Sequence, residues 1–133
     1  MVKKTITYKD FNNNERTEEL YFHLTELDAT ELALEMPAGL LEAEGEERVK
    51  LLEEIGHKGI LDFVKKLTLK AYGKKGGDDG YSFVKDEQIA KDFSNTMAFS
   101  AFVMSLVHND ELLAEFINGV MPVIENSEGS VSQ

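Results

Sequence analysis

The first part of the chain alternates between apolar and polar positions, the pattern of β-strands that bury one face. The alternation runs through residues 3–10 and again through residues 15–24. Its apolar members are Ile6 and Tyr8 in the first segment and Leu20, Phe22 and Leu24 in the second. The Asn-rich stretch "FNNN" joins the segments, and Asn tolerates the left-handed backbone of tight turns. We therefore predict an N-terminal β-hairpin.

Beyond the hairpin, apolar residues recur at the three-to-four-residue spacing of helices. Thr25 and Asp28 are candidate N-caps for a short helix that ends near Pro37, and Asp28-Ala-Thr-Glu31 has the spacing of a capping box. Further helices are predicted over residues 40–55 and 60–71. Gly45 is a weak point in the first of these, Gly56 and Gly59 bracket a break between them, and Gly73 is the expected left-handed C-terminal cap.

The C-terminal part contains three more predicted helices. Residues 73–82, "GKKGGDDGYS", have the composition of a loop. Asp86 is expected to cap a helix that Ser94-Asn95-Thr96 interrupts before a second helix over residues 97–107. Asn109 or Asp110 should cap the last helix, which is expected to end at Asn118-Gly119, before Pro122.

Together these elements predict an α+β fold that is mostly α, with an N-terminal β-hairpin followed by a bundle of about five to six helices. Residues 1–122 are expected to form a single domain. Residues 123–133, "VIENSEGSVSQ", are expected to be a disordered tail because they are short of the large apolar side chains that build a core.

The predicted helix over residues 97–107 is unusually apolar, since only Ser100 and Ser105 in it are polar. Such a helix can be the buried centre of a bundle. Alternatively, part of its face can dock a partner or a second copy, because flexible methionine side chains suit surfaces that receive varied apolar segments. The candidate partner-binding residues are Met97, Phe99, Phe102, Val103, Met104, Leu106, Phe116 and Met121.

Charge narrows the range of partners. The chain has 133 residues and a net charge of −11, which repels phosphate backbones, so we expect no binding to nucleic acid. Eight acidic residues and no Lys or Arg lie between Glu26 and Glu47. This stretch is either a solvated face or a surface for a basic partner. No apolar run reaches the length of a membrane span, and there is neither a secretory leader nor a cysteine, so a cytoplasmic protein is expected.

Candidate chemistry is sparse. Glu54-Ile-Gly-His57 has the Glu-x-x-His spacing of di-iron bundles, but those sites need a second copy of the motif, which the sequence lacks. His23 is expected on the solvent side of a strand, and His108 in the last turn of an apolar helix. Asp78-Asp79-Gly80 lacks the ligand spacing of a calcium loop. We therefore expect no enzyme, cofactor or metal, with a metal-dependent enzyme at Glu54 and His57 as a rival hypothesis.

Three blocks of sequence, in order, resemble the tail assembly chaperones of long-tailed phages and prophages of Gram-positive bacteria. They are "KKTITYKDFNNNERTEELYFHLTELD", "YGKKGGDDGYSFVKDEQIAKDFSNTMAFSAF" and "LLAEFINGVMP", which together cover most of residues 3–122. Within them, the family pattern includes the "ERTE" strand with its aromatic pair, the Tyr-Gly and Asp-Gly turns, and Phe-Ser-x-Thr before an aromatic helix. The turn "NNNE" departs from the commoner Asn-Gly, and "PAGLLEAEGEERVKLL" is more acidic than expected.

The resemblance implies a non-enzymatic role during virion assembly. Such chaperones bind the long tape measure protein, keep it soluble and help recruit major tail protein subunits around it. They act in the host cytoplasm and are absent from the mature virion, and many of their genes also yield a longer, frameshifted product. Self-association remains possible. The rival from another class is an acidic interaction module, such as a nucleic-acid mimic that blocks a DNA-binding protein.

Overall fold

The computed structural model describes residues 1–37, 39–76 and 83–122. Over these ranges the chain forms an antiparallel sheet in the strand order β1-β2-β3-β4, together with five helices. The strands are β1 (Val2–Lys9), β2 (Glu15–Phe22), β3 (Tyr72–Lys75) and β4 (Phe83–Val84). The helices are α1 (Glu26–Glu35), α2 (Gly45–Ala71), α3 (Glu87–Ser94), α4 (Met97–Val107) and α5 (Asp110–Val120). This is the predicted α+β arrangement of an N-terminal hairpin followed by helices. The predicted tail and most of the 73–82 loop lie outside the described residues.

The hairpin is confirmed, and local polar contacts explain its turn. Strands β1 and β2 pair in register from Val2 opposite Phe22 to Lys9 opposite Glu15. At the turn, the Asp10 side chain accepts hydrogen bonds from the backbone N–H groups of Asn12 and Asn14, both at 2.9 Å. Asn13 takes the left-handed conformation, with φ 67°, which asparagine tolerates better than most residues. The chain therefore reverses within five residues.

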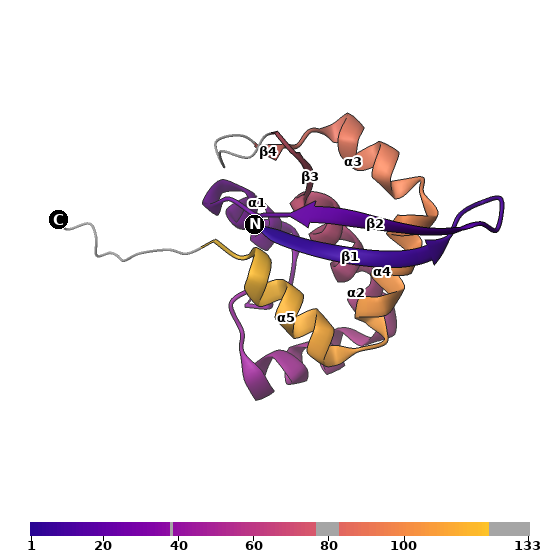
Figure 1. Ribbon diagram of the computed structural model, residues 1–133. Coiled ribbons are helices and arrows are strands. Elements are labelled where there is room, and N and C mark those ends of the chain that lie inside the picture. The colour runs from indigo at the N-terminus through magenta and orange to yellow at the C-terminus, as the bar shows by residue number, and fades with distance from the viewer. Residues whose placement is uncertain (38, 77–82, 123–133) are drawn as a thin grey trace.

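The helices lie on one face of this hairpin (Figure 1). Along β1, every second residue is exposed, while the apolar face of β2 buries Leu20 and Phe22. The ring of Phe22 contacts those of Tyr72, Phe93, Phe102 and Phe116, with centroids 4.8 to 6.4 Å apart. One aromatic cluster thus joins the sheet to α3, α4 and α5.

The first helix begins where the sequence indicated, but with a different capping box. Thr25 is the N-cap: its side chain accepts from the backbone N–H of Asp28, and the Asp28 carboxylate accepts from the backbone N–H of Thr25. The box is therefore Thr25–Asp28, and the predicted box Asp28–Glu31 is wrong. Thr25 is the cap because it has extended backbone angles, whereas Asp28 already lies in the first helical turn.

The second helix differs from the prediction at its start, whereas the predicted break in its middle is present at Gly56. Residues 40–42 form turns, residues 43 and 44 are irregular, and the helix begins only at Gly45, which has φ 57°. At Gly56, the φ of 73° and ψ of −177° are not helical, and this kink separates two helices that together make up α2. Gly59 lies within the helix after the kink. The kink divides α2 into a first arm, residues 45–55, and a second arm, residues 57–71, which point in different directions.

Strand β3 was not predicted. Gly73 does not cap α2 in a left-handed conformation; the chain leaves the helix at Tyr72 in an extended conformation and pairs with Tyr21 and Phe22 of β2. Gly73 is required instead by a close approach, because a Cβ there would lie 2.7 Å from the ring of Phe83 and 2.6 Å from Lys85. The composition of a loop therefore concealed a sheet strand.

The remaining caps follow the sequence closely. The side chains of Asp86, Thr96 and Asn109 accept hydrogen bonds from the first turns of α3, α4 and α5. The last helix continues through Asn118 and Gly119 to Val120, one residue past the predicted end. Within the described residues, no helix has the length and apolarity needed to cross a membrane.

Candidate functional site

Four of the eight residues predicted to bind a partner belong to the core. Phe102, Val103, Leu106 and Phe116 are buried. Phe102 stacks on Phe22 with ring centroids 4.8 Å apart and an interplanar angle of 15°. These side chains cannot meet a partner unless the core opens, so the buried-helix alternative describes this side of α4.

The other four candidates are accessible to different degrees. Met97 and Met104 are 37% and 41% exposed and are seven residues apart on α4, so they share one side of the helix. Phe99 and Met121 are partly buried, and Phe99 packs edge-on against Phe93 with centroids 5.4 Å apart. Partner binding by these exposed methionines stays a prediction.

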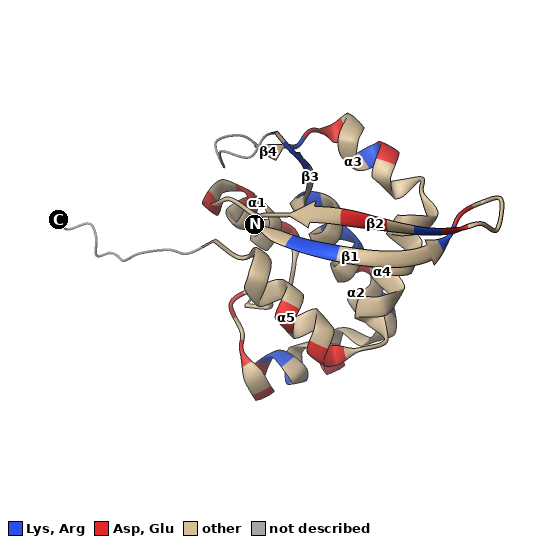
Figure 2. Ribbon diagram, viewed as in Figure 1, with Lys and Arg blue, Asp and Glu red and all other residues tan. Residues whose placement is uncertain are grey.

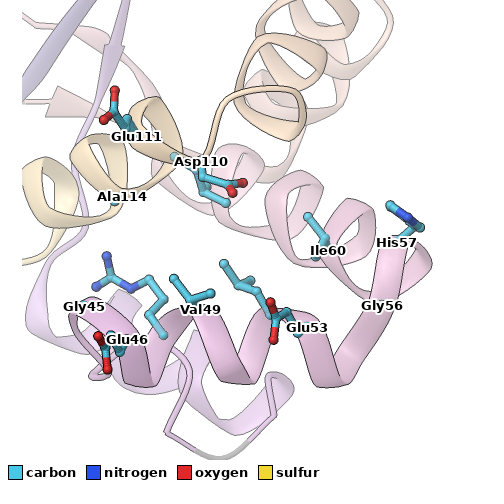
Figure 3. Close-up of a pocket in the computed structure, with 13 residues that line it drawn as sticks. Gly45, Glu46, Val49, Glu53, Gly56, His57, Ile60, Asp110, Glu111 and Ala114 are labelled. Atoms are coloured by element: carbon cyan, nitrogen blue, oxygen red, sulfur yellow. The ribbon is translucent and has the colours of Figure 1, made fainter.

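The structure contains a groove that the sequence did not indicate. It lies between α2 and the first turns of α5 (Figure 3). The α2 side consists of the first arm and the start of the second arm. The volume of the groove is about 780 Å³. Its apolar wall consists of Val49, Leu52, Ile60, Leu113 and Ala114. Val49 is 49% exposed, so the groove offers apolar surface to solvent.

Two local features of the sequence form this groove. The left-handed Gly56 kinks α2, and the kink lies in the groove lining between Glu53 and Ile60. The Asn109 cap starts α5 so that its first turn contributes Asp110 and Glu111 to the groove lining, and the Glu111 carboxylate points away from the helix that carries Val49 (Figure 3). Groove residues thus come from segments far apart in the sequence.

Carboxylates surround the apolar wall. Glu46 and Glu53 come from α2, and Asp110 and Glu111 come from α5. All four are exposed, and within the described parts of the chain none forms an ion pair with Lys or Arg. The groove is therefore apolar inside and negatively charged at its edge.

Arg48 is the exception among the groove residues. It is only 6% exposed, and burial lowers the pKa of its guanidinium although nearby Glu44 opposes that effect. Of its five N–H donors, one bonds a protein group in the described residues: Nη2 donates to Asn118 Oδ1 at 3.3 Å. Its Nε is buried without a hydrogen-bond partner. A buried cation with so few partners costs folding free energy.

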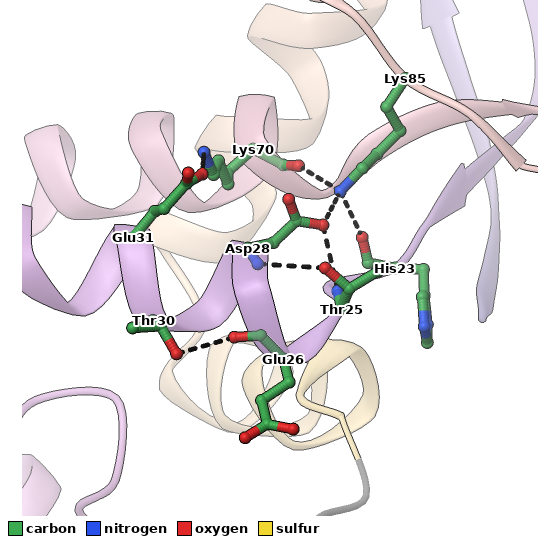
Figure 4. Close-up of polar contacts among 8 residues, drawn as sticks. All are labelled: His23, Thr25, Glu26, Asp28, Thr30, Glu31, Lys70 and Lys85. Carbon is green, nitrogen blue, oxygen red and sulfur yellow. Dashed lines mark hydrogen bonds and ion pairs between the residues drawn. The ribbon is translucent and has the colours of Figure 1, made fainter.

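A second polar cluster, around Lys85, has a structural role (Figure 4). The Lys85 ammonium donates to the Asp28 carboxylate, to the carbonyl of His23 at 3.0 Å and to the carbonyl of Lys70 at 2.9 Å. Burial alone would raise the pKa of Asp28, but the bonds from Lys85 and from the backbone of Thr25 outweigh it and hold that pKa below its usual value. Lys85 thus ties α1, the end of β2 and the end of α2 together.

The three histidines do not form a chemical site. His23 is half-buried rather than on the solvent side: burial lowers its pKa, its Nδ1 has no hydrogen-bond partner, and its ring lies edge-on to Phe83. His108 is the exposed C-cap of α4, and His57 is exposed just after the kink. Among the described residues, no group of three His, Cys, Asp or Glu side chains is placed to hold a metal ion. Glu54 and His57 therefore lack further ligands there.

The acidic stretch from Glu26 to Glu47 does not form one uniform surface. Asp28 is paired with Lys85, and Glu31 bonds Lys70 with 2.6 Å between Oε1 and Nζ. Most of the other carboxylates are exposed on α1, in residues 40–44 and at the start of α2. Figure 2 shows acidic residues on α1, α2 and α5, whereas β1 carries lysines. Of the eight carboxylates in this stretch, only Glu46 lines the groove.

The described surface thus has an apolar groove with carboxylates at its edge. The chain belongs to the phage tail assembly chaperone family, whose model matches residues 1–127. It has no significant match to a curated protein or to a solved structure. The family is an accessory, non-catalytic one, so the protein is a chaperone of tail assembly that interacts with other tail proteins.

Proposed function

We propose that this chaperone binds the tape measure protein, keeps it soluble and helps recruit major tail protein subunits to it in the host cytoplasm. Membership of the tail assembly chaperone family carries this proposal. Two physical properties support it. Exposed apolar side chains on α2 can cover apolar client surface, and the net charge of −11 keeps the complex dissolved.

Co-expression with the tape measure protein of the same tail gene cluster tests the proposal. The soluble fraction of the tape measure protein, measured after high-speed centrifugation, is expected to rise severalfold when the chaperone is present. An unrelated acidic protein of similar size serves as the control. An unchanged soluble fraction would refute tape measure binding.

Recruitment and release need separate measurements. Addition of chaperone-bound tape measure protein to major tail protein is expected to shorten the lag of tube formation, followed by light scattering and electron microscopy. Immunoblots of purified virions are expected to lack the chaperone. A chaperone band at the stoichiometry of a structural protein would contradict a purely transient role.

A further inference from the structure

We propose that the groove between α2 and α5 binds an amphipathic helix of a tail protein, with lysines or arginines beside its apolar face and an oxygen acceptor that reaches Arg48. This inference rests on the proposed function and assigns a place to it. The groove was absent from the sequence predictions, which centred partner binding on α4, with Phe116 and Met121 of the last helix and its cap.

The shape and lining of the groove fit a helix. Two helical walls and a volume of about 780 Å³ leave room for a row of apolar side chains against Val49, Leu52 and Ile60. Helix-in-groove recognition uses such a row at helical spacing. Burial of Val49, now half-exposed, would contribute favourable transfer free energy on binding.

The rim selects the charge of the occupant. Glu46, Glu53, Asp110 and Glu111 surround the groove, and the described residues supply no cation that pairs with them. Basic residues flanking the apolar face of a bound helix would complement these carboxylates and speed the encounter. An acidic segment would be repelled, and so would the equivalent face of a second copy.

Arg48 supplies a second, independent indication of a ligand. This groove residue is only 6% exposed. Even so, its guanidinium has a single hydrogen bond within the described residues, at 3.3 Å. Buried arginines normally have several acceptors around their planar set of donors. A carboxylate of the bound segment, or the free carbonyls at the end of its helix, would supply them.

Matched variants test the location. Val49→Asp places a charge in the groove, and Met104→Asp places the same charge at a similarly exposed position on α4, outside it. Glu53→Lys reverses a rim charge, and Glu54→Lys makes the same change at the next, exposed residue, which does not line the groove. Binding of the tape measure protein and of an overlapping peptide array of the tail proteins is measured with each purified, full-length variant.

We expect Val49→Asp and Glu53→Lys to weaken binding by about tenfold or more, as charge placed at or reversed around a buried contact does. Met104→Asp and Glu54→Lys are expected to leave it within about twofold. The captured peptides should be apolar helices flanked by Lys or Arg. Arg48→Met should weaken binding without lowering the melting temperature, whereas a purely structural arginine would lose stability with the same change.

The outcomes separate this inference from the proposed function. If the wild type solubilises the tape measure protein and the groove variants do so equally well, the groove inference is wrong and the function stands. If Met104→Asp alone abolishes binding, the α4 surface is the docking site. If the wild type does not bind the tape measure protein, the function is wrong. The groove inference then survives only if basic peptides of another tail protein bind the wild type and not Val49→Asp. If Val49→Asp only converts a dimer into a monomer, the groove is a self-interface and the inference fails.

Discussion

Phe22 is the residue on which the core converges. It is fully buried at the end of β2, and its ring meets aromatic residues of β3, α3, α4 and α5. Those partners lie far along the chain from Phe22. The cluster therefore holds several elements together and does not stabilise one element alone. Phe102, which was expected to be a candidate for partner binding, is one member of it.

Phe22→Ala is expected to lower the free energy of unfolding by about 3–5 kcal/mol, because it removes a large buried ring and leaves a cavity. Chemical denaturation followed by circular dichroism measures the change. Phe11→Ala is the matched control, because Phe11 is exposed at the hairpin turn and should cost little. A Phe22→Ala protein as stable as wild type would show that the aromatic cluster does not hold the core together.

Asp28 makes the free energy of unfolding depend on pH in the acid range. Its pKa lies below the ordinary value because Lys85 and Thr25 favour the carboxylate despite its burial. A lowered pKa in the folded state stabilises the fold above the unfolded value of about 4, and that contribution is lost as the pH falls through the folded value. The charge on Asp28 thus supports folding at neutral pH and not in strong acid.

Asp28→Asn should therefore be less stable than wild type by a constant margin above about pH 4, and the margin should shrink below it. Urea denaturation at a series of pH values measures the difference in the free energy of unfolding. Glu54→Gln, an exposed residue outside this cluster, is the comparison. A margin for Asp28→Asn that stays unchanged in strong acid would rule out the Lys85 pairing as its cause.

Among the elements, α2 defines the groove, because its kink sets the angle between its two arms. The conformation of Gly56, with φ 73° and ψ −177°, lies in a region that is essentially reserved for glycine. Apart from the adjoining residues and backbone of α2, no group in the described part of the chain lies within 4 Å of the place where a Cβ would be. Glycine is therefore required at position 56 by the backbone conformation and not by crowding from neighbouring side chains.

Gly56→Ala is expected to lower the free energy of unfolding by roughly 1–3 kcal/mol. Lys58→Ala, at an exposed position two residues further along, should change it by less than about 0.5 kcal/mol. Thermal and chemical unfolding of both variants provide the measurement. Equal stability of the two would mean that α2 tolerates a straight path at Gly56.

Local signals predicted the elements that depend on local chemistry. Alternation gave the hairpin, and the side chains of Asp86, Thr96 and Asn109 marked helix starts that the structure confirms. Strand β3 could not be predicted because Tyr72-Gly-Lys-Lys has a low propensity for strands. It pairs with β2 through two residues, Tyr72 and Gly73, that only the tertiary fold brings there.

The groove could not be predicted for a similar reason. Val49 and Leu113 lie on helices far apart in the sequence, and neither helix pattern reveals which neighbour it meets. The apolar composition of α4 instead drew attention to a helix whose Phe102, Val103 and Leu106 are core. One residue in the sequence could have pointed to the groove. Arg48 is a charged residue at a buried position of the helix, and it lines the groove with Val49 and Leu52.

Across the whole molecule, negative charge outweighs positive charge. A net charge of −11 creates a field that attracts basic segments and is screened by salt over roughly 10 Å at 0.1 M. The rim carboxylates concentrate that field at the groove. Long-range attraction should therefore act mainly on the rate of encounter.

The association rate with the tape measure protein is expected to fall by about tenfold or more between low and high ionic strength, with a smaller change in the dissociation rate. Stopped-flow fluorescence at several NaCl concentrations measures both rates. Sucrose at matched osmolality is the control for non-ionic effects. An association rate that is independent of salt would show that the acidic surface does not steer the client.

The first strand lies against the last helix. A Cβ at Gly119 would come within 2.9 Å of the Val2 side chain, Lys4 pairs with Glu115 at 3.0 Å, and the N–H of Leu24 donates to the carbonyl of Val120 at 3.1 Å. During translation the hairpin emerges well before α4 and α5, which cover its apolar face. The nascent hairpin must therefore wait with Leu20 and Phe22 uncovered until nearly all of the described chain has left the ribosome. This tail assembly chaperone thus has an apolar hairpin face that needs protection while the chain is being made.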